Sequence, residues 1–266
     1  MTEQQTDFST VIDRMLAPSS GAPESLPADW AQGRTAFGGF SSALMLGAVY
    51  RDHQDLAPLR SALINFTGPI SERPEVSTEI LRQGRNVTTV HTRAMNGEKT
   101  SAFGVFTFGV TRESHLAQAH PAPPAQHPDD YKIDVFDPGK RPGFHQHFDI
   151  RDIEGDPYMS GSDRGYIRKW IRFRDERARA RPEATLCLAD CLPPSAFPMM
   201  TQFGPNSSVN WICNFFDENI ETEGGWYQVE SSLTATKNGY SSQVMRMWNT
   251  KGNMVVDGMQ SVLIFA

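Results

Sequence analysis

Three polar side chains lie among apolar neighbours in the second half of the sequence. Asp190 lies within Leu186–Pro194, Gln260 lies within Val255–Leu263, and Ser208 opens a strand-like run. A carboxylate in apolar surroundings costs free energy unless it is paired, and its pKa rises, which suits a general base. Each residue also has an ordinary interpretation. Asp190 would be a solvated helix residue, Gln260 would lie on the solvent face of a strand, and Ser208 would be a hydroxyl at a strand start. The residue types alone leave both interpretations open.

The pair Gly38-Gly39 opens an apolar, helix-like stretch in the first half. Glycine lets a substrate approach the backbone N–H groups of a helix N-terminus, and such groups could stabilise an oxyanion. Tight helix packing is the alternative explanation for the pair.

Several familiar catalytic signatures are absent from the sequence. It has no Gly-x-Ser-x-Gly elbow, no Walker loop, no His-Glu-x-x-His and no GxGxxG after a strand-like run. All seven histidines precede residue 150, which excludes a Ser-His-Asp triad confined to the second half. The three cysteines, Cys187, Cys191 and Cys213, are interpreted as buried small hydrophobes rather than as metal ligands or a disulfide framework. Because no disulfide framework is expected, we expect a reducing compartment, the cytoplasm.

A repeat is the clearest sign of organisation. Apolar stretches at 38–51 and 184–200 predict one helix in each half, and strand-like runs separated by turn residues follow each of them. These runs are 60–66, 75–82, 87–95 and 100–110 in the first half, and 208–216, 226–236, 240–248 and 254–265 in the second. The halves can be aligned with Ile64–Phe66 over Cys213–Phe215, Arg93 over Arg246, Gly104 over Gly258 and Phe106 over Gln260. We interpret the repeat as a duplication, with chance similarity between hairpins as the alternative.

Each repeated unit therefore consists of one helix and four or more antiparallel strands, an α+β arrangement. A sheet that buries one face needs an apolar partner across it, so we expect each sheet to wrap around its helix. Alternation in the run 208–216 predicts that Trp211 and Cys213 share one face, and that Ser208 and Asn210 share the other.

Prolines mark the segment between the halves. Arg112–Phe144 contains six of them and is predicted to be a linker that crosses the surface. We expect a short helix at Phe8–Leu16. We also expect a strand at Gly165–Phe173, a segment that could alternatively form an amphipathic helix. The resulting domain boundaries are a first unit at 1–111, the linker at 112–150 and a second unit at 151–266.

Composition excludes several functional classes. The 266 residues carry 25 Lys and Arg against 31 Asp and Glu, a net charge of −6, which argues against nucleic-acid binding. The longest weakly polar stretch, Phe37–Tyr50, is shorter than the roughly 20 residues of a membrane span. The polar segment Met1–Asp7 has no feature of a secretory signal.

The pattern resembles the acyl-CoA thioesterase II (TesB-type) double hot-dog family from about Trp30 to Ala266. In the first half the resemblance rests on Phe37-Gly38-Gly39-Phe40 and Phe66-Thr67-Gly68-Pro69-Ile70. In the second half it rests on Leu188-Ala189-Asp190, Ser207-Ser208-Val209-Asn210 and Met259-Gln260-Ser261-Val262. It implies two tandem hot-dog units, each an antiparallel sheet wrapped around one long helix, in a protein of lipid metabolism.

The resemblance also implies roles for residues. In that family an Asp, a Thr or Ser and a Gln bind the nucleophilic water, and Asp190, Ser208 and Gln260 fall on these positions. Water would attack a thioester carbonyl, and Gly38 and Gly39 would be the candidate substrate-binding pair. No cofactor and no metal are implied, and the expected partners are the acyl-CoA substrate and further copies of the chain, as a homodimer or higher homo-oligomer.

The sequence departs from the family in two places. Asn210-Trp211 and Asn214-Phe215 replace an Asp-His pair and a Trp-Phe pair, which leaves the acyl specificity open. The first unit lacks an equivalent of Asp190 and has Phe106 at the position of Gln260, so we expect one active site per chain. A hot-dog hydratase or dehydratase and a non-catalytic acyl-binding protein remain alternatives.

Copies of the chain could contact one another through surface aromatic residues. The candidates are Trp226, Tyr240 and Trp248, and ordinary core positions are the alternative.

Overall fold

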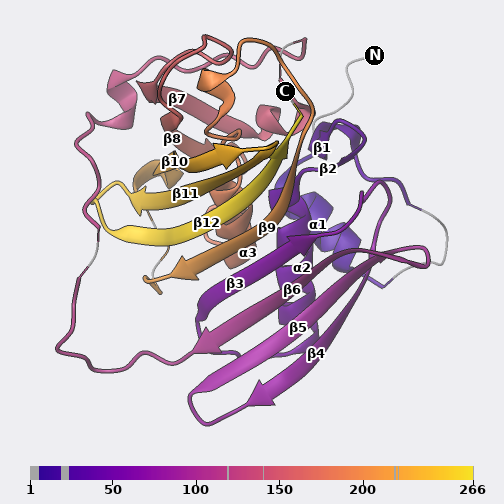
Figure 1. Ribbon diagram of the computed structural model, residues 1–266. Helices are drawn as coiled ribbons and strands as arrows, with labels where there is room; N and C mark the ends of the chain where they lie inside the picture. The colour runs from indigo at the N-terminus through magenta and orange to yellow at the C-terminus, as the bar shows by residue number, and fades with distance from the viewer. Residues whose placement is uncertain are drawn as a thin grey trace.

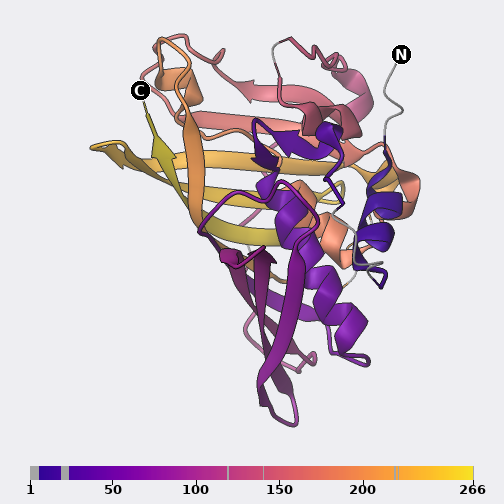
Figure 2. The same cartoon turned by 90° about the vertical axis from the view of Figure 1, so that its right-hand side faces the viewer.

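The fold is described from a computed structural model, for residues 6–18, 24–118, 120–139, 141–218, 220 and 222–265. Ten strands form one antiparallel sheet in the order β4-β5-β6-β3-β9-β12-β11-β10-β8-β7 (Figure 1). The helices α1 (Phe8–Leu16), α2 (Gly38–Asp52) and α3 (Pro182–Ala189) lie on one side of this sheet (Figure 2).

The strands of the first half are β3 (Leu59–Phe66), β4 (Glu75–Gln83), β5 (Val87–Asn96) and β6 (Lys99–Gly109). Those of the second half are β7 (Phe148–Gly155), β8 (Tyr166–Phe173), β9 (Asn206–Phe215), β10 (Tyr227–Lys237), β11 (Tyr240–Asn249) and β12 (Met254–Ile264). A short pair, β1 (Ala31–Gln32) and β2 (Thr35–Ala36), precedes α2.

The sheet repeats the same strand order outward from its centre. From the central pair β3 and β9, the order is β3, β6, β5, β4 on one side and β9, β12, β11, β10 on the other. Gly104 pairs with Ile64 and Thr92, whereas Gly258 pairs with Cys213 and Met245. These are the residues that the sequence alignment places over one another, so the register agrees with that alignment.

The predicted helix at 184–200 is too long. α3 ends at Ala189, and Asp190 is its C-cap residue. Pro193 and Pro194 follow, and proline has no N–H with which to continue a helix. Asp190 therefore lies at the end of a helix rather than inside one, while the predicted helices at 8–16 and 38–51 are confirmed to within one residue.

The run 165–173 forms β8, so the strand interpretation is confirmed and the amphipathic helix is wrong. β7 was not predicted, and it begins within the range assigned to the linker.

The proline-rich segment crosses the second half of the sheet on its outer face, which is the face opposite the helices. Its backbone carbonyls accept hydrogen bonds from side chains of four strands, in the pairs Trp248–His120, Gln228–Pro123, Arg168–Pro124, Trp170–Gln126 and Arg151–Pro128. Trp226 and Trp248 are buried within the chain, which overturns their interpretation as surface aromatics, whereas Tyr240 is exposed.

No helix among the described residues is long and apolar enough to cross a membrane. The first five residues of the polar N-terminal segment lie outside the described residues.

Candidate active site

The Asp190 carboxyl group lies where the helices of the two halves meet. Asp190 is the C-cap residue of α3, and α2 begins with Gly38 and Gly39 beside it. A Cβ atom on Gly38 would lie 2.8 Å from Asp190 Oδ2 and 3.3 Å from the ring of Phe66. The carboxyl group is thus packed against the first turn of α2, and its residue is only 8% exposed.

A hydrogen bond and a nearby backbone N–H group stabilise the carboxylate. Gln260 Nε2 on β12 donates to Oδ1 at 2.8 Å, and the backbone N–H of Gly39 lowers the pKa of the same carboxyl group. The first turn of a helix has N–H groups without intrahelical acceptors, and the helix dipole favours an anion there. The start of α2 therefore supplies part of the compensation that a buried carboxylate requires.

Burial dominates the acidity of Asp190. Loss of hydration raises its pKa to about 7, against the opposing effect of the Gln260 hydrogen bond and the Gly39 N–H. A carboxyl group with this pKa exchanges its proton near neutral pH, as a general base must. The solvated alternative for Asp190 is wrong, because the residue is buried.

Gln260 faces the interior, contrary to the solvent-facing interpretation, and is 3% exposed. Its Oε1 accepts from Nε2 of Gln243 on β11 at 2.8 Å. Gln243 Oε1 in turn accepts from the backbone N–H of Ser195 at 2.8 Å and from its hydroxyl at 3.0 Å. Sequence reasoning missed both Gln243 and Ser195.

Ser208 lies on the same sheet face as Gln260 but is not paired with it across the strands. A register shift in the pairing of β9 with β12 places Ser208 opposite the buried Val262, two positions beyond Gln260. The expected alternation, with Ser208 and Asn210 on one face, is therefore wrong, because the shift reverses the pattern at this point. Within the described residues no hydrogen bond joins the Ser208 hydroxyl to Asp190 or Gln260.

The glycine pair is required for close packing. A Cβ on Gly39 would lie 2.5 Å from the backbone oxygen of Cys187, in addition to the approach of Gly38 to Asp190. The Gly39 N–H acts on the carboxyl group of Asp190, whereas the Gly38 N–H has no hydrogen-bond acceptor among the described residues. The Gly38 N–H therefore remains able to donate to another group.

The end of the linker forms a wall beside this site. Phe144 stacks on Phe37, the residue before Gly38, with ring centroids 3.8 Å apart. The ring of His145 lies 3.2 Å from the carbonyl oxygen of Cys191, the residue after Asp190. Burial lowers the pKa of His145 to about 4, so this imidazole is neutral at physiological pH.

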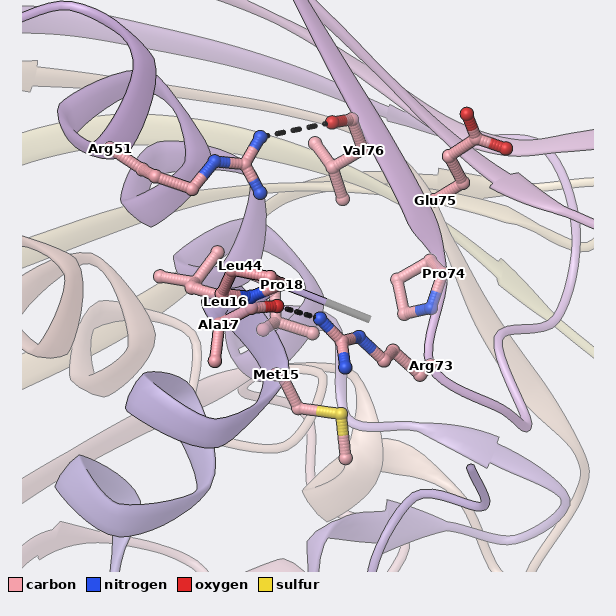
Figure 3. Close-up of a pocket in the computed structure, with 10 residues that line it drawn as sticks. All are labelled: Met15, Leu16, Ala17, Pro18, Leu44, Arg51, Arg73, Pro74, Glu75 and Val76. Carbon is pink, nitrogen blue, oxygen red and sulfur yellow. Dashed lines mark hydrogen bonds between the residues drawn. The ribbon is translucent and has the colours of Figure 1, made fainter. Parts of the chain in front are cut away.

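A cavity of about 680 Å³ lies away from Asp190, between the end of α1, the middle of α2 and the start of β4 (Figure 3). Leu16, Leu44 and Val76 line it together with two arginines. Both guanidinium groups are engaged with backbone carbonyls, Arg51 with Val76 and Arg73 with Ala17. The cavity does not include any predicted site residue.

The three cysteines are buried and unpaired, as expected of small hydrophobes. Burial raises the pKa of each thiol well above its ordinary value, which keeps the sulfur atoms protonated. Among the described residues no group of three metal-ligating side chains occurs.

The repeated strand order and the helices on one face define a double hot-dog protein. Residues 118–264 match the acyl-CoA thioesterase C-terminal domain, and residues 26–109 match the acyl-CoA thioesterase N-terminal domain. The matches cover well over half of the sequence, so the chain belongs to the acyl-CoA thioesterase family.

Solved structures share this fold over nearly their whole length. A conserved hot-dog protein of unknown function from Alicyclobacillus acidocaldarius is 20% identical, with a TM-score of 0.83 over 96% of this chain and 98% of its own. A tesB protein from Mycobacterium avium subs paratuberculosis is 17% identical, with a TM-score of 0.76 and coverages of 96% and 98%. The acyl-CoA thioesterase II TesB2 from Mycobacterium marinum is 16% identical, with a TM-score of 0.69 and the same coverages, 96% and 98%. No curated protein matches the sequence.

Proposed function

We propose that this protein hydrolyses acyl-CoA thioesters, with Asp190 as the general base. The observation that carries the proposal is the buried Asp190 carboxylate, which accepts a hydrogen bond from Gln260 and lies against the first turn of α2. A pKa near 7 lets this group accept a proton at neutral pH and release it after turnover. Membership of the acyl-CoA thioesterase family supplies the thioester as the substrate class.

In the proposed reaction a water molecule attacks the thioester carbonyl while Asp190 accepts its proton. The C–S bond then breaks, the acid leaves as a carboxylic acid or carboxylate, and the proton is delivered to the CoA sulfur. Gln260 holds the carboxylate in place, and the Ser208 hydroxyl serves as a second water ligand. The N–H of Gly38 at the start of α2 donates to the developing oxyanion. No cofactor is required for this hydrolysis.

One site per chain is proposed, because the first unit has apolar residues at the equivalent positions. Phe106 stands where the second unit has Gln260, and it is fully buried. Both units nevertheless contribute, since Gly38 belongs to the first and Asp190 to the second. Neither unit alone would hold the complete site.

Steady-state release of free thiol from a panel of acyl-CoAs of different chain length tests the proposal. We expect Asp190→Asn to lower kcat/KM by at least about 1,000-fold, as loss of a general base does in combination with loss of water orientation. Asp257→Asn is the matched control, because Asp257 lies on β12, the strand of Gln260, but is partly exposed and pairs with Arg246. Thiol release that survives Asp190→Asn would refute the assignment of the base.

The alternatives give different results in the same assay. A binding protein would retain acyl-CoA without releasing thiol, and a hydratase would change the absorbance of enoyl-CoA without releasing thiol. Homo-oligomerisation and a reducing compartment stay predictions; light scattering of the purified protein tests the first.

A further inference from the structure

Three polar residues, of which only the last contacts the carboxylate, form a hydrogen-bonded series that ends at Asp190. Ser195 is joined to Gln243, Gln243 to Gln260, and Gln260 to Asp190. All four residues are buried, and Ser195 and Gln243 are fully buried. The series connects the loop after α3, β11 and β12.

A backbone N–H fixes the direction of this series. The N–H of Ser195 can only donate, so it must meet the oxygen of the Gln243 amide rather than its nitrogen. Gln243 Nε2 then faces Gln260 and must meet Oε1 of that residue. Only Nε2 of Gln260 is left to face Asp190, as a donor. Each amide orientation follows from the one before it.

The first half of the chain provides an internal comparison. Val90 and Phe106 occupy the positions on β5 and β6 that Gln243 and Gln260 occupy on β11 and β12. Both are fully buried and belong to the main apolar core. The fold thus accepts two apolar side chains here, and buried amides are costly unless every polar atom is paired. The glutamine pair is therefore not a requirement of the fold.

We propose that Gln243 is a positioning residue that forces Gln260 to present its NH2 group, and not its oxygen, to Asp190. The role in hydrolysis rests on the proposed function, whereas the orientation itself does not. Without Gln243 the terminal amide of Gln260 is free to turn by half a rotation. Its oxygen would then face the carboxylate, and this contact repels the ionised form.

The pH profile reports the orientation, since a donor favours the ionised carboxyl group and an oxygen disfavours it. Among the described residues, the titratable groups beside Asp190 are the thiols of Cys187, Cys191 and Cys213 and the imidazole of His145, whose pKa burial lowers to about 4. Burial raises the pKa of these thiols, so they remain neutral in the range where Asp190 titrates. A shift of the acidic limb therefore reports on Gln260 and not on a neighbouring charge.

The first test is Gln243→Met, which keeps the length of the side chain and removes its hydrogen bonds to Ser195 and Gln260. We expect kcat to fall about tenfold, as for the loss of one hydrogen bond, with little change in KM. The acidic limb of the profile should move to higher pH. Gln228→Met is the matched control, because Gln228 is an equally buried amide whose Nε2 donates to Pro123 at the outer face of the sheet. It should leave kcat and the profile unchanged.

Two further measurements separate positioning from a merely structural role. If Gln243 acts through Gln260, the double variant Gln243→Met/Gln260→Leu should be no slower than Gln260→Leu alone. If the double variant instead loses kcat by the product of the two single factors, the proposal is overturned. Carbon NMR of aspartate-labelled protein should show a higher pKa for Asp190 in Gln243→Met even if no acyl-CoA is hydrolysed. An unchanged pKa would also overturn it.

Gln243→Glu provides a second variant in case Gln243→Met does not fold, since it keeps an acceptor for Ser195. When protonated, the introduced carboxyl group can still donate to Gln260; when ionised, it can only accept and reverses that amide. Activity should therefore fall at high pH, where the wild-type protein reaches its plateau. A profile with the wild-type shape would contradict the proposal.

Discussion

The carboxyl group of Asp190 lies against Gly38, where an added Cβ atom would be 2.8 Å from Oδ2. Gly38 is the first residue of the helix in the first unit, and Asp190 is the C-cap residue of the helix in the second. A helix C-terminus disfavours a carboxylate, whereas a helix N-terminus favours one. The charge at Asp190 therefore depends on both halves of the chain remaining together.

Replacing this carboxylate should stabilise the protein at alkaline pH. The pKa of Asp190 is raised from 3.8 to about 7, so between these values the folded state holds a proton that the unfolded state has lost. Stability from this group is full below about pH 4 and is lost as the pH rises to about 7, a loss of about 4 kcal/mol.

We accordingly expect Asp190→Asn to be more stable than wild type by about 2 to 4 kcal/mol at pH 8 and nearly equal at pH 4. Urea unfolding at the two pH values measures this difference. Asp257→Asn, at a partly exposed position, should show no such gain at pH 8. Equal stability of wild type and Asp190→Asn at pH 8 would show that ionisation of the buried carboxyl group does not destabilise the folded protein.

Much of this arrangement follows from the sequence. Turn residues and apolar alternation predict the long strands, and the alignment of Gly104 with Gly258 predicts the repeated register. Asp190 and Gln260 are recognisable because each polar side chain stands in an apolar run. Both signals are local, so they can be recognised without knowledge of tertiary contacts.

The parts that escaped prediction depend on contacts between distant segments. Gln243 lies on the interior face with Met245 and Met247, and its alignment with Val90 was available as a sign of a buried amide. Its partner Ser195 is 48 residues away along the chain, and no local pattern joins them. The face of Ser208 depends on a register shift, which strand alternation cannot foresee.

A methyl group at Gly38 should disturb the site more than the fold. Its Cβ would lie 2.8 Å from Asp190 Oδ2, so the carboxylate must move. Because a displacement of about 1 Å can cost about 100-fold in rate, we expect Gly38→Ala to lower kcat/KM by about that factor. Gly47→Ala in the same helix is the control, since its Cβ would meet only the flexible end of Leu16. Equal activity of the two variants would argue against close packing of α2 on the carboxylate.

Removing the Ser208 hydroxyl tests whether it binds the water. We expect Ser208→Ala to lower kcat about tenfold, as for one lost hydrogen bond, and Ser208→Thr to retain most activity because the hydroxyl is kept. Ser207→Ala is the control, because Ser207 is exposed and pairs with Leu263. Full activity of Ser208→Ala would remove Ser208 from the site and leave Asp190 and Gln260 as its polar members.

The contact of the linker with the sheet should affect stability and proteolysis but not catalysis. Trp248 Nε1 donates to the carbonyl of His120 at 2.9 Å, and this indole is fully buried. Trp248→Phe removes the hydrogen bond and part of the buried ring, so we expect a loss of about 1 to 3 kcal/mol. Cleavage within residues 112–130 by a broad-specificity protease should become faster, because side-chain donors of this kind join the segment to the sheet. The carboxylate lies on the opposite face, so kcat should stay at the wild-type value. A fall in kcat without faster cleavage would show instead that β11 transmits the change to Gln243.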